Sequence, residues 1–148
     1  MLPAVREYNT VCNSSNKLLI IAEGFESRAL AWLSKLEDTV MFDNAIICEY
    51  VPPKKSRYAE VLELVTKHTK NNPKNLKYNR FEPTVFEMEL RNCFLDIDMY
   101  DDVYVDITVM SKLLIMIVLN ELREYRKSVQ RLTLEKLLRL TKTESRRL

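Results

Sequence analysis

The sequence predicts an α/β fold: a three-layer, Rossmann-like domain with a mainly parallel sheet of four or five strands and helices on both faces. Four times along the chain, a strand-like segment is followed by a helix-like one, in units of roughly 30 residues. Most of the strand-like segments are continuous apolar runs, which is typical of strands buried on both faces. At 148 residues, 47% of them hydrophobic, we expect residues 1–148 to form a single domain.

The first unit follows an N-terminal arm, residues 1–16, which has no clear periodicity and ends in the polar run NSSN. Residues 17–23 (KLLIIAE) form an apolar run that predicts the first central strand. Gly24 marks the turn after this strand. Residues 26–36 then predict a helix whose apolar stripe contains Ala29, Trp32, Leu33 and Leu36.

The second and third units repeat this order. Residues 44–51 (NAIICEYV) predict a strand that ends at Pro52, because proline cannot donate to a strand ladder. Ser56 is the predicted N-cap of the second helix. Residues 75–82 predict a weaker third strand with alternating polarity. Pro83 begins a third helix with a continuous apolar face: Phe86, Leu90, Cys93, Phe94 and Ile97.

The fourth unit, residues 101–122, is the centre of the predicted fold. A strand rich in β-branched residues is followed by a tight turn and then by seven consecutive apolar residues, 113–119. Such a run covers the whole circumference of a helix, so we expect this helix to be buried on nearly every side. After Arg126, residues 128–134 predict either a fifth strand followed by a helix or part of one long helix.

The turn after the fourth strand carries the strongest candidate site. Right-handed crossovers place all strand-to-helix turns along one edge of a parallel sheet, where ligands bind in open α/β folds. Backbone N–H groups, the positive end of a helix, two hydroxyls and a lysine together suit a phosphate. In the structural alternative, a hydroxyl caps the helix, the aspartate bonds the turn and the lysine is solvated. The residues concerned are Asp106, Thr108, Ser111 and Lys112.

Other turns add charged residues to the same predicted edge. Arg28 follows the first strand, and Lys54 and Lys55 follow the second, so all three could assist in holding an anionic ligand. Glu23 ends the first strand at the same edge. We expect the lysine and hydroxyls of the fourth turn to hold phosphate, and Asp106 to bond a ribose hydroxyl or to orient the turn.

The segment V-D-I-T-V-M-S-K, residues 105–112, resembles the turn of CARF-type Rossmann-like sensor domains. In that family the turn contacts cyclic oligonucleotide messengers of antiviral signalling, although Val109 and Met110 here stand where the family usually has glycines. The resemblance implies a nucleotide-binding sensor subunit of a prokaryotic defence system, with a cyclic oligonucleotide or related nucleotide as ligand. In this interpretation we expect the chain to bind its ligand without catalysing a reaction and without a cofactor.

A second interpretation is catalytic. Residues 23–28 (EGFESR) resemble the start of a Toprim domain, in which this glutamate and a later Asp-x-Asp pair support Mg²⁺-dependent phosphodiester chemistry. The Asp-x-Asp pair of this chain, at residues 96–98, ends a predicted helix rather than a strand. The strand-end carboxylates Glu23, Glu49 and Asp106 are the alternative ligand set, since Mg²⁺ prefers oxygen ligands.

Composition excludes several other kinds of site. With Gly24 as its only glycine, the chain has neither a P-loop nor a dinucleotide fingerprint. Three cysteines and one histidine, His68, supply neither a disulfide framework nor a zinc site, and His68 lies on a predicted core stripe. No apolar run approaches the length of a membrane span. We therefore expect a cytoplasmic protein that does not enter a membrane.

The C-terminal end of the chain is basic. Residues 123–148 contain nine Lys or Arg against three Glu, and the rest of the chain is correspondingly acidic. The basic segment 127–148 suits contact with nucleic acid or with an acidic protein partner, and a solvated helix face is the plain alternative. A homo-oligomer is a separate expectation. A third interpretation is therefore a non-enzymatic assembly subunit that docks through this segment.

Overall fold

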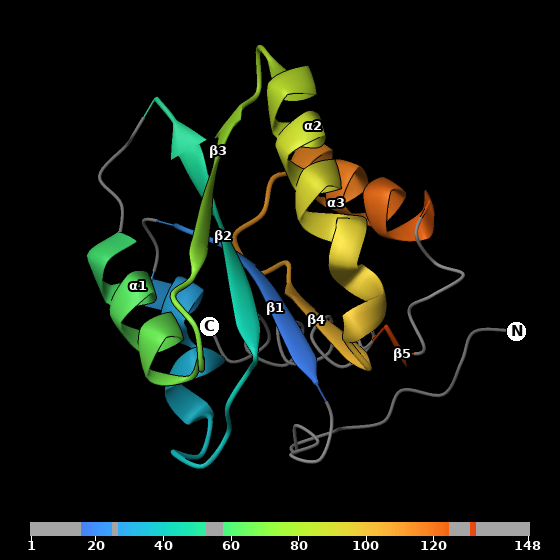
Figure 1. The fold of residues 1–148 in the computed structure, drawn as a ribbon. Coiled ribbons are helices and arrows are strands. Elements are labelled where there is room, and N and C mark those ends of the chain that lie inside the picture. The colour runs from blue at the N-terminus through green and yellow to red at the C-terminus, as the bar shows by residue number, and fades with distance from the viewer. Residues whose placement is uncertain (1–15, 25–26, 53–57, 125–130, 133–148) are drawn as a thin grey trace, which may run out of the picture.

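The computed structural model describes residues 16–24, 27–52, 58–124 and 131–132 (Figure 1). Within them, five strands form one sheet in the order β3-β2-β1-β4-β5, and every neighbouring pair is parallel. The predicted Rossmann-like α/β fold is confirmed. Of the two alternatives for residues 128–134, the described residues 131–132 form a strand. The strands are β1 (Lys17–Ala22), β2 (Asn44–Val51), β3 (Lys74–Asn79), β4 (Asp102–Asp106) and β5 (Arg131–Leu132).

Helices lie on both faces of the sheet. Leu18, Ile20 and Ala22 of β1 belong to a core beneath α2, η3 and α3. Leu19 and Ile21 of the same strand belong to a second core beneath η1, η2 and α1. The α-helices are α1 (Tyr58–Lys67), α2 (Pro83–Cys93) and α3 (Lys112–Glu124), and the 3-10 helices are η1 (Ser27–Leu30), η2 (Leu33–Lys35) and η3 (Phe94–Met99).

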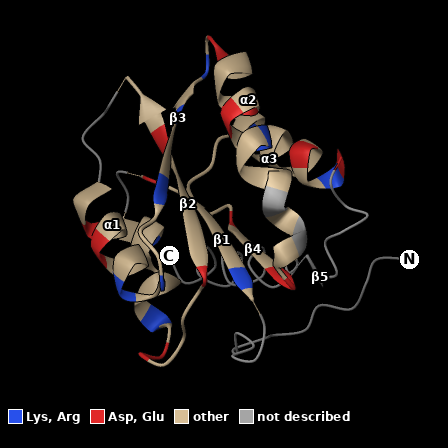
Figure 2. Cartoon of the chain, in the orientation of Figure 1, with Lys and Arg blue, Asp and Glu red and all other residues tan. Residues whose placement is uncertain are grey.

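The central strand β1 is the deepest element of the fold. It pairs with β2 on one side and β4 on the other, so that Ile20 lies opposite both Ile46 and Val105. Residues 19–22 are completely buried. Charged residues of β1 and β4 are confined to the strand ends, as Figure 2 shows. In these two strands, charged side chains are therefore found only where the strand begins or ends.

The second and third units follow the prediction closely. β2 has the predicted bounds, and α2 begins at Pro83 with the predicted residues Phe86 and Leu90 buried. β3 ends at Asn79, three residues earlier than predicted, because Asn79 closes a turn: its side-chain oxygen accepts from the Phe81 N–H at 3.0 Å and its carbonyl accepts from the Glu82 N–H at 3.0 Å. The predicted N-cap of α1, Ser56, lies outside the described residues.

The first crossover differs from the prediction. A single helix over residues 26–36 is wrong for the described part of that segment, which forms the two short helices η1 and η2. Ala29 and Leu33 are nevertheless buried as predicted. A 3-10 helix rises about 2.0 Å per residue against about 1.5 Å for an α-helix. The extended form lets a short segment cover the sheet between the carboxyl end of β1 and the amino end of β2.

Helix α3 is not buried on every side, and that prediction is also wrong. Leu113 is 43% exposed and Met116 is 68% exposed. The helix packs one side against the sheet through Leu114, Val118 and their neighbours, while the apolar run continues around the outer side. An unbroken apolar run therefore does not distinguish a helix that is covered by the fold from one that presents an apolar outer face.

A charged pair joins α2 to α3. The Arg91 guanidinium donates to both carboxylate oxygens of Glu121, from Nε at 3.1 Å and from Nη2 at 2.8 Å. The Glu121 side chain is only 2% exposed, whereas the Arg91 side chain is 53% exposed. The arginine therefore brings its charge to a buried carboxylate from the solvent side.

His68 and Cys48 are core residues. His68 is 1% exposed, and its Nδ1 lies 2.9 Å from the carbonyl oxygen of Val40. Cys48 is fully buried in β2, and burial, together with the nearby Cys93, raises the pKa of its thiol to about 12. No helix in the described part of the chain is long and apolar enough to cross a membrane.

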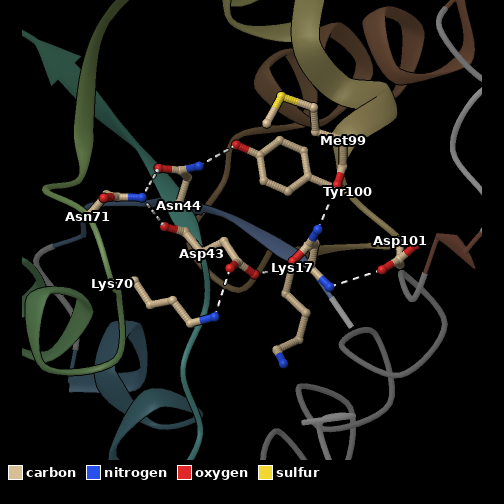
Figure 3. Close-up of polar contacts among 9 residues, drawn as sticks. Lys17, Asp43, Asn44, Lys70, Asn71, Met99, Tyr100 and Asp101 are labelled. Atoms are coloured by element: carbon tan, nitrogen blue, oxygen red, sulfur yellow. Dashed lines mark hydrogen bonds and ion pairs between the residues drawn. The ribbon is translucent and has the colours of Figure 1, made fainter. Parts of the chain in front are cut away.

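The amino edge of the sheet is closed by a polar network (Figure 3). The Asp43 carboxylate accepts from the Lys17 N–H at 2.7 Å and from Lys70 Nζ at 2.9 Å. Asn71 Nδ2 donates to the carbonyl of Asp43 and to the side chain of Asn44, whose own amide donates to the hydroxyl of Tyr100. These bonds tie the start of β1 to the segments that precede β2 and β3.

Replacing Asp43 by asparagine should lower the free energy of unfolding by about 1–2 kcal/mol at neutral pH, since two charge-assisted bonds are weakened. Partial burial opposes ionisation, but the bonds and charges of Lys70 and Lys17 outweigh it and lower the pKa of Asp43. The carboxylate therefore stabilises the fold above its unfolded pKa, and this contribution is lost as the pH falls through the lower folded pKa. Denaturant titrations of both proteins from about pH 7 down to about pH 3 should show the difference shrinking. A difference that is constant with pH would contradict this role.

Candidate functional site at the strand switch point

The strand order reverses between β1 and β4. The chain leaves β1 towards β2 and β3 on one side, then returns across the sheet to β4 and β5 on the other. At such a switch point the turns after the two central strands diverge, which is where open α/β sheets bind ligands. Here those turns are residues 23–24 after β1 and residues 107–111 after β4. We refer to them together as the switch-point site.

The turn after β1 is held against β2 and against the other turn. Glu23 is 2% exposed; its N–H donates to the Cys48 carbonyl at 3.0 Å, and its carboxylate accepts from the Tyr50 N–H at 3.0 Å. Gly24 lies directly against Val109. A Cβ atom at Gly24 would come within 2.9 Å of the Val109 Cβ and Cγ1 atoms. The only glycine of the chain is therefore required by this close contact.

The turn after β4 is organised by Asp106. This residue is 2% exposed, and its Oδ1 accepts from the Thr108 N–H at 2.9 Å and also from the Thr108 hydroxyl. The Met110 N–H donates to the Ile107 carbonyl at 3.2 Å, which closes the turn. Asp106 therefore bonds the turn, as the structural alternative predicted, and it also orients the hydroxyl of Thr108.

Ser111 and Lys112 begin α3. Ser111 Oγ accepts from the Leu114 N–H at 3.2 Å, so Ser111, rather than Thr108, caps this helix. Lys112 is the first residue of the helix and is exposed to solvent. The first N–H groups of a helix have no intrahelical acceptor and carry its positive dipole end. The predicted hydroxyl and lysine thus lie together at a helix end suited to an anion.

Tyr50 joins the two strands that flank β1 and was not predicted as a site residue. Its hydroxyl donates to the Val109 carbonyl at 2.8 Å and accepts from the Ser111 N–H at 2.8 Å. Its ring packs edge-on against Tyr78, with ring centroids 5.7 Å apart. Burial raises the pKa of Tyr50 even though the bonds with Ser111 oppose this change. The one sequence signal was an aromatic residue near the carboxyl end of a predicted strand.

Replacing Tyr50 by phenylalanine should lower the free energy of unfolding by about 1 kcal/mol, because two backbone groups of the turn lose their partner while the ring packing remains. Urea titration would measure the change. The matched control is Tyr58→Phe in α1, whose hydroxyl bonds an exposed side chain, that of Asn75. Equal effects of the two changes would show that the Tyr50 hydroxyl has no special role in holding the turn.

The remaining predicted residues are distributed differently. Arg28 is exposed on η1, and Lys54 and Lys55 lie outside the described residues. Glu49 accepts from Asn75 Nδ2 at 3.4 Å. Among the described residues, no group of three or more His, Cys, Asp or Glu side chains is placed to hold a metal ion. The described positions of Glu23, Glu49 and Asp106 therefore give no support to the Mg²⁺ interpretation.

Comparisons with protein-family models, with curated proteins and with solved structures found no match for this chain. The resemblance of residues 105–112 to CARF-type turns therefore stays a prediction. The function of the chain is inferred from its fold and from the contacts of the switch-point site.

Proposed function

We propose that the chain binds a nucleotide or a nucleotide-derived signal at the switch-point site and acts as a sensor rather than as an enzyme. The observation that carries this proposal is the placement of the α3 N-terminus, with Ser111 and Lys112, at the point where the strand order reverses. This is the position at which Rossmann-like sheets bind phosphate-containing ligands. A role in a prokaryotic antiviral system belongs to the same proposal and depends on the CARF resemblance.

In this proposal the phosphate lies just outside the N-terminal end of α3. The groups that could contact it there are Ser111 Oγ, the exposed Lys112 and the first backbone N–H groups of the helix. The Ser111 N–H is bonded to Tyr50 and the Leu114 N–H to Ser111 Oγ, so the N–H groups of Lys112 and Leu113 are the natural donors. Asp106 holds the turn in place rather than contacting the phosphate.

Binding of a ligand between the two turns requires movement, because Val109 fills the space next to Gly24. Displacing Val109 also moves its carbonyl, which accepts the Tyr50 hydroxyl bond. A ligand at the switch-point site would therefore be coupled to the contact between β2 and the start of α3. This coupling suits a sensor, because ligand binding at the switch-point site would then change a contact between two parts of the protein.

Thermal unfolding with mononucleotides and cyclic oligonucleotides tests the proposal. A ligand at 100 times its dissociation constant stabilises the fold by about 2.7 kcal/mol, a shift of several degrees. We expect Lys112→Ala to weaken binding about tenfold or more, since a charged contact to phosphate is lost. The control Lys74→Ala removes an exposed lysine from the amino end of β3 and should leave binding unchanged.

Three outcomes would reject the proposal: no thermal shift with any nucleotide, a shift that Lys112→Ala retains in full, or equal losses in Lys112→Ala and Lys74→Ala. A shift that requires Mg²⁺ and is accompanied by cleavage of DNA or RNA would instead favour phosphodiester chemistry. Loss of a partner complex on deletion of residues 127–148, with the switch-point variants unaffected, would favour the assembly interpretation.

A further inference from the structure

Tyr50 connects the two turns of the switch-point site, one through its backbone and the other through its side chain. Its N–H donates to the carboxylate of Glu23, in the turn after β1, at 3.0 Å. Its hydroxyl reaches the turn after β4, where it donates to the Val109 carbonyl and accepts from the Ser111 N–H, both at 2.8 Å. A single residue of β2 thus holds together the turns that follow β1 and β4.

Val109 occupies the space between the same two turns. A Cβ atom at Gly24 would lie 2.9 Å from the Val109 Cβ and Cγ1 atoms, so the two turns are in direct contact. Val109 also packs against the cores of both sheet faces. We call this arrangement, with Val109 against Gly24 and the Tyr50 hydroxyl bonded to the turn after β4, the closed form. It fills the position at which an open α/β sheet binds its ligand.

The Tyr50 oxygen also occupies a position that suits an anion. Ser111 immediately precedes Lys112, the first residue of α3. N–H groups at a helix N-terminus have no intrahelical acceptor and commonly bind phosphate oxygens. In the closed form, the Ser111 N–H donates to the Tyr50 oxygen at 2.8 Å. The hydroxyl therefore takes the place of a phosphate oxygen at this donor.

We propose that Tyr50 opposes ligand binding at the switch-point site: its hydroxyl stabilises the closed form, and a phosphate-containing ligand binds by displacing it. This inference rests on the proposed function, because it concerns the regulation of the same site. Displacement adds the Ser111 N–H to the donors that can contact the phosphate. It also frees the Val109 carbonyl, so that the Val109 side chain can leave Gly24.

The closed form sets the apparent affinity for the ligand. When a ligand binds only the open form, its apparent dissociation constant is the intrinsic constant divided by the open fraction. A change that destabilises only the closed form therefore tightens binding. If the Tyr50 hydroxyl instead only positioned Ser111 and Lys112 for the ligand, its removal would weaken binding. Both roles predict a less stable fold, but they predict opposite changes in affinity.

Tyr50→Phe is the decisive variant, and Tyr78→Phe is its matched control. Tyr78 lies opposite Tyr50 in the register of β2 and β3, and the two rings pack edge-on with their centroids 5.7 Å apart. Tyr78 is 2% exposed, and its buried hydroxyl has no hydrogen-bond partner among the described residues. Each change removes one hydroxyl from the same aromatic pair, but only Tyr50→Phe releases the turn after β4.

Nuclear magnetic resonance without ligand tests the closed form. We expect Tyr50→Phe to weaken the nuclear Overhauser effect between the Val109 methyl groups and the Gly24 Hα atoms, because the open fraction rises. Hydrogen exchange of the Met110 amide, whose bond closes the turn, should become about fivefold faster. Tyr78→Phe should leave both measurements unchanged.

Isothermal titration calorimetry with mononucleotides and cyclic oligonucleotides tests the competition with a ligand. Tyr50→Phe should bind about fivefold more tightly than the wild type, because the closed form loses its bonds to the hydroxyl. Val109→Ala, which shortens the side chain next to Gly24, should also tighten binding. Tyr78→Phe should bind as the wild type does. Tighter binding by a less stable Tyr50→Phe protein would support the inference.

The possible failures have different meanings. If Tyr50→Phe weakens binding or leaves it unchanged, or if Tyr50→Phe and Tyr78→Phe have equal effects, the inference is overturned while the proposed function stands. An unchanged nuclear Overhauser effect in Tyr50→Phe would likewise overturn the inference alone. Absence of binding by the wild type and by every variant would reject the proposed function and, with it, this inference.

Discussion

Replacing Gly24 by valine should lower the free energy of unfolding by about 3 kcal/mol, which corresponds to roughly 10 °C in the midpoint of thermal unfolding. The new side chain would overlap Val109, whose Cβ and Cγ1 atoms lie 2.9 Å from the position of a Cβ at residue 24. The turn cannot simply withdraw, because the Val109 carbonyl is bonded to the Tyr50 hydroxyl at 2.8 Å. Calorimetry of the variant and the wild type would measure the difference.

A double-mutant cycle identifies the cause of this loss. Gly24→Ala and Val109→Gly each destabilise the fold alone, but together they should cost about 1–2 kcal/mol less than the sum of the single changes, since the overlap is gone. No residue of the described chain has a positive φ angle, so relief of backbone strain does not complicate the comparison. Additive effects would mean that Gly24 is needed for a reason other than its contact with Val109.

Replacing Arg91 by methionine should also lower the free energy of unfolding, by about 3 kcal/mol. The change keeps the aliphatic packing of the arginine but leaves the Glu121 carboxylate, 2% exposed, without two hydrogen bonds. This decrease in the free energy of unfolding should lie at the lower end of the range for broken buried ion pairs, because water can reach the space vacated by the half-exposed guanidinium. Urea titration at neutral pH would measure it.

Two further variants serve as controls for Arg91→Met. The double change Arg91→Met with Glu121→Leu should recover most of the lost stability, since no buried carboxylate remains. Lys67→Met breaks the ion pair with Asp38, in which the Lys67 Nζ and Asp38 Oδ1 atoms are 2.7 Å apart. Both of these side chains are largely exposed, so the change should leave the free energy of unfolding nearly unaltered. Equal effects of Arg91→Met and Lys67→Met would contradict the importance of burial at Glu121.

The fold was predictable because strand burial is visible in the sequence. The apolar runs at 17–23 and 44–51 match β1 and β2 almost residue for residue, and Pro83 marks the first residue of α2. The predictions were wrong where several conformations bury the same residues. The first crossover buries Ala29 and Leu33 as 3-10 turns instead of one α-helix, and the apolar run of α3 includes the exposed Met116.

The candidate site was predictable in its location but not in its contacts. Asp106, Ser111 and Lys112 could be placed at the correct turn, because strand ends and helix starts have clear sequence signals. The role of Tyr50 could not, since its hydroxyl reaches a segment about 60 residues away, beyond the reach of any local pattern. The same is true of the fit between Gly24 and Val109, which depends on the distance between two turns.

The strand order has a consequence for synthesis of the protein on the ribosome. β1 is made first, yet one of its two edges pairs with β4, some 85 residues later in the chain. Until residues 102–106 emerge, the apolar segment 18–22 has an unpaired edge and an uncovered face, the features that promote association between nascent chains. Long-range parallel pairing also closes slowly. The chain should therefore be most vulnerable to aggregation after β2 has been made and before β4 has been made, when one edge of β1 has no strand to pair with.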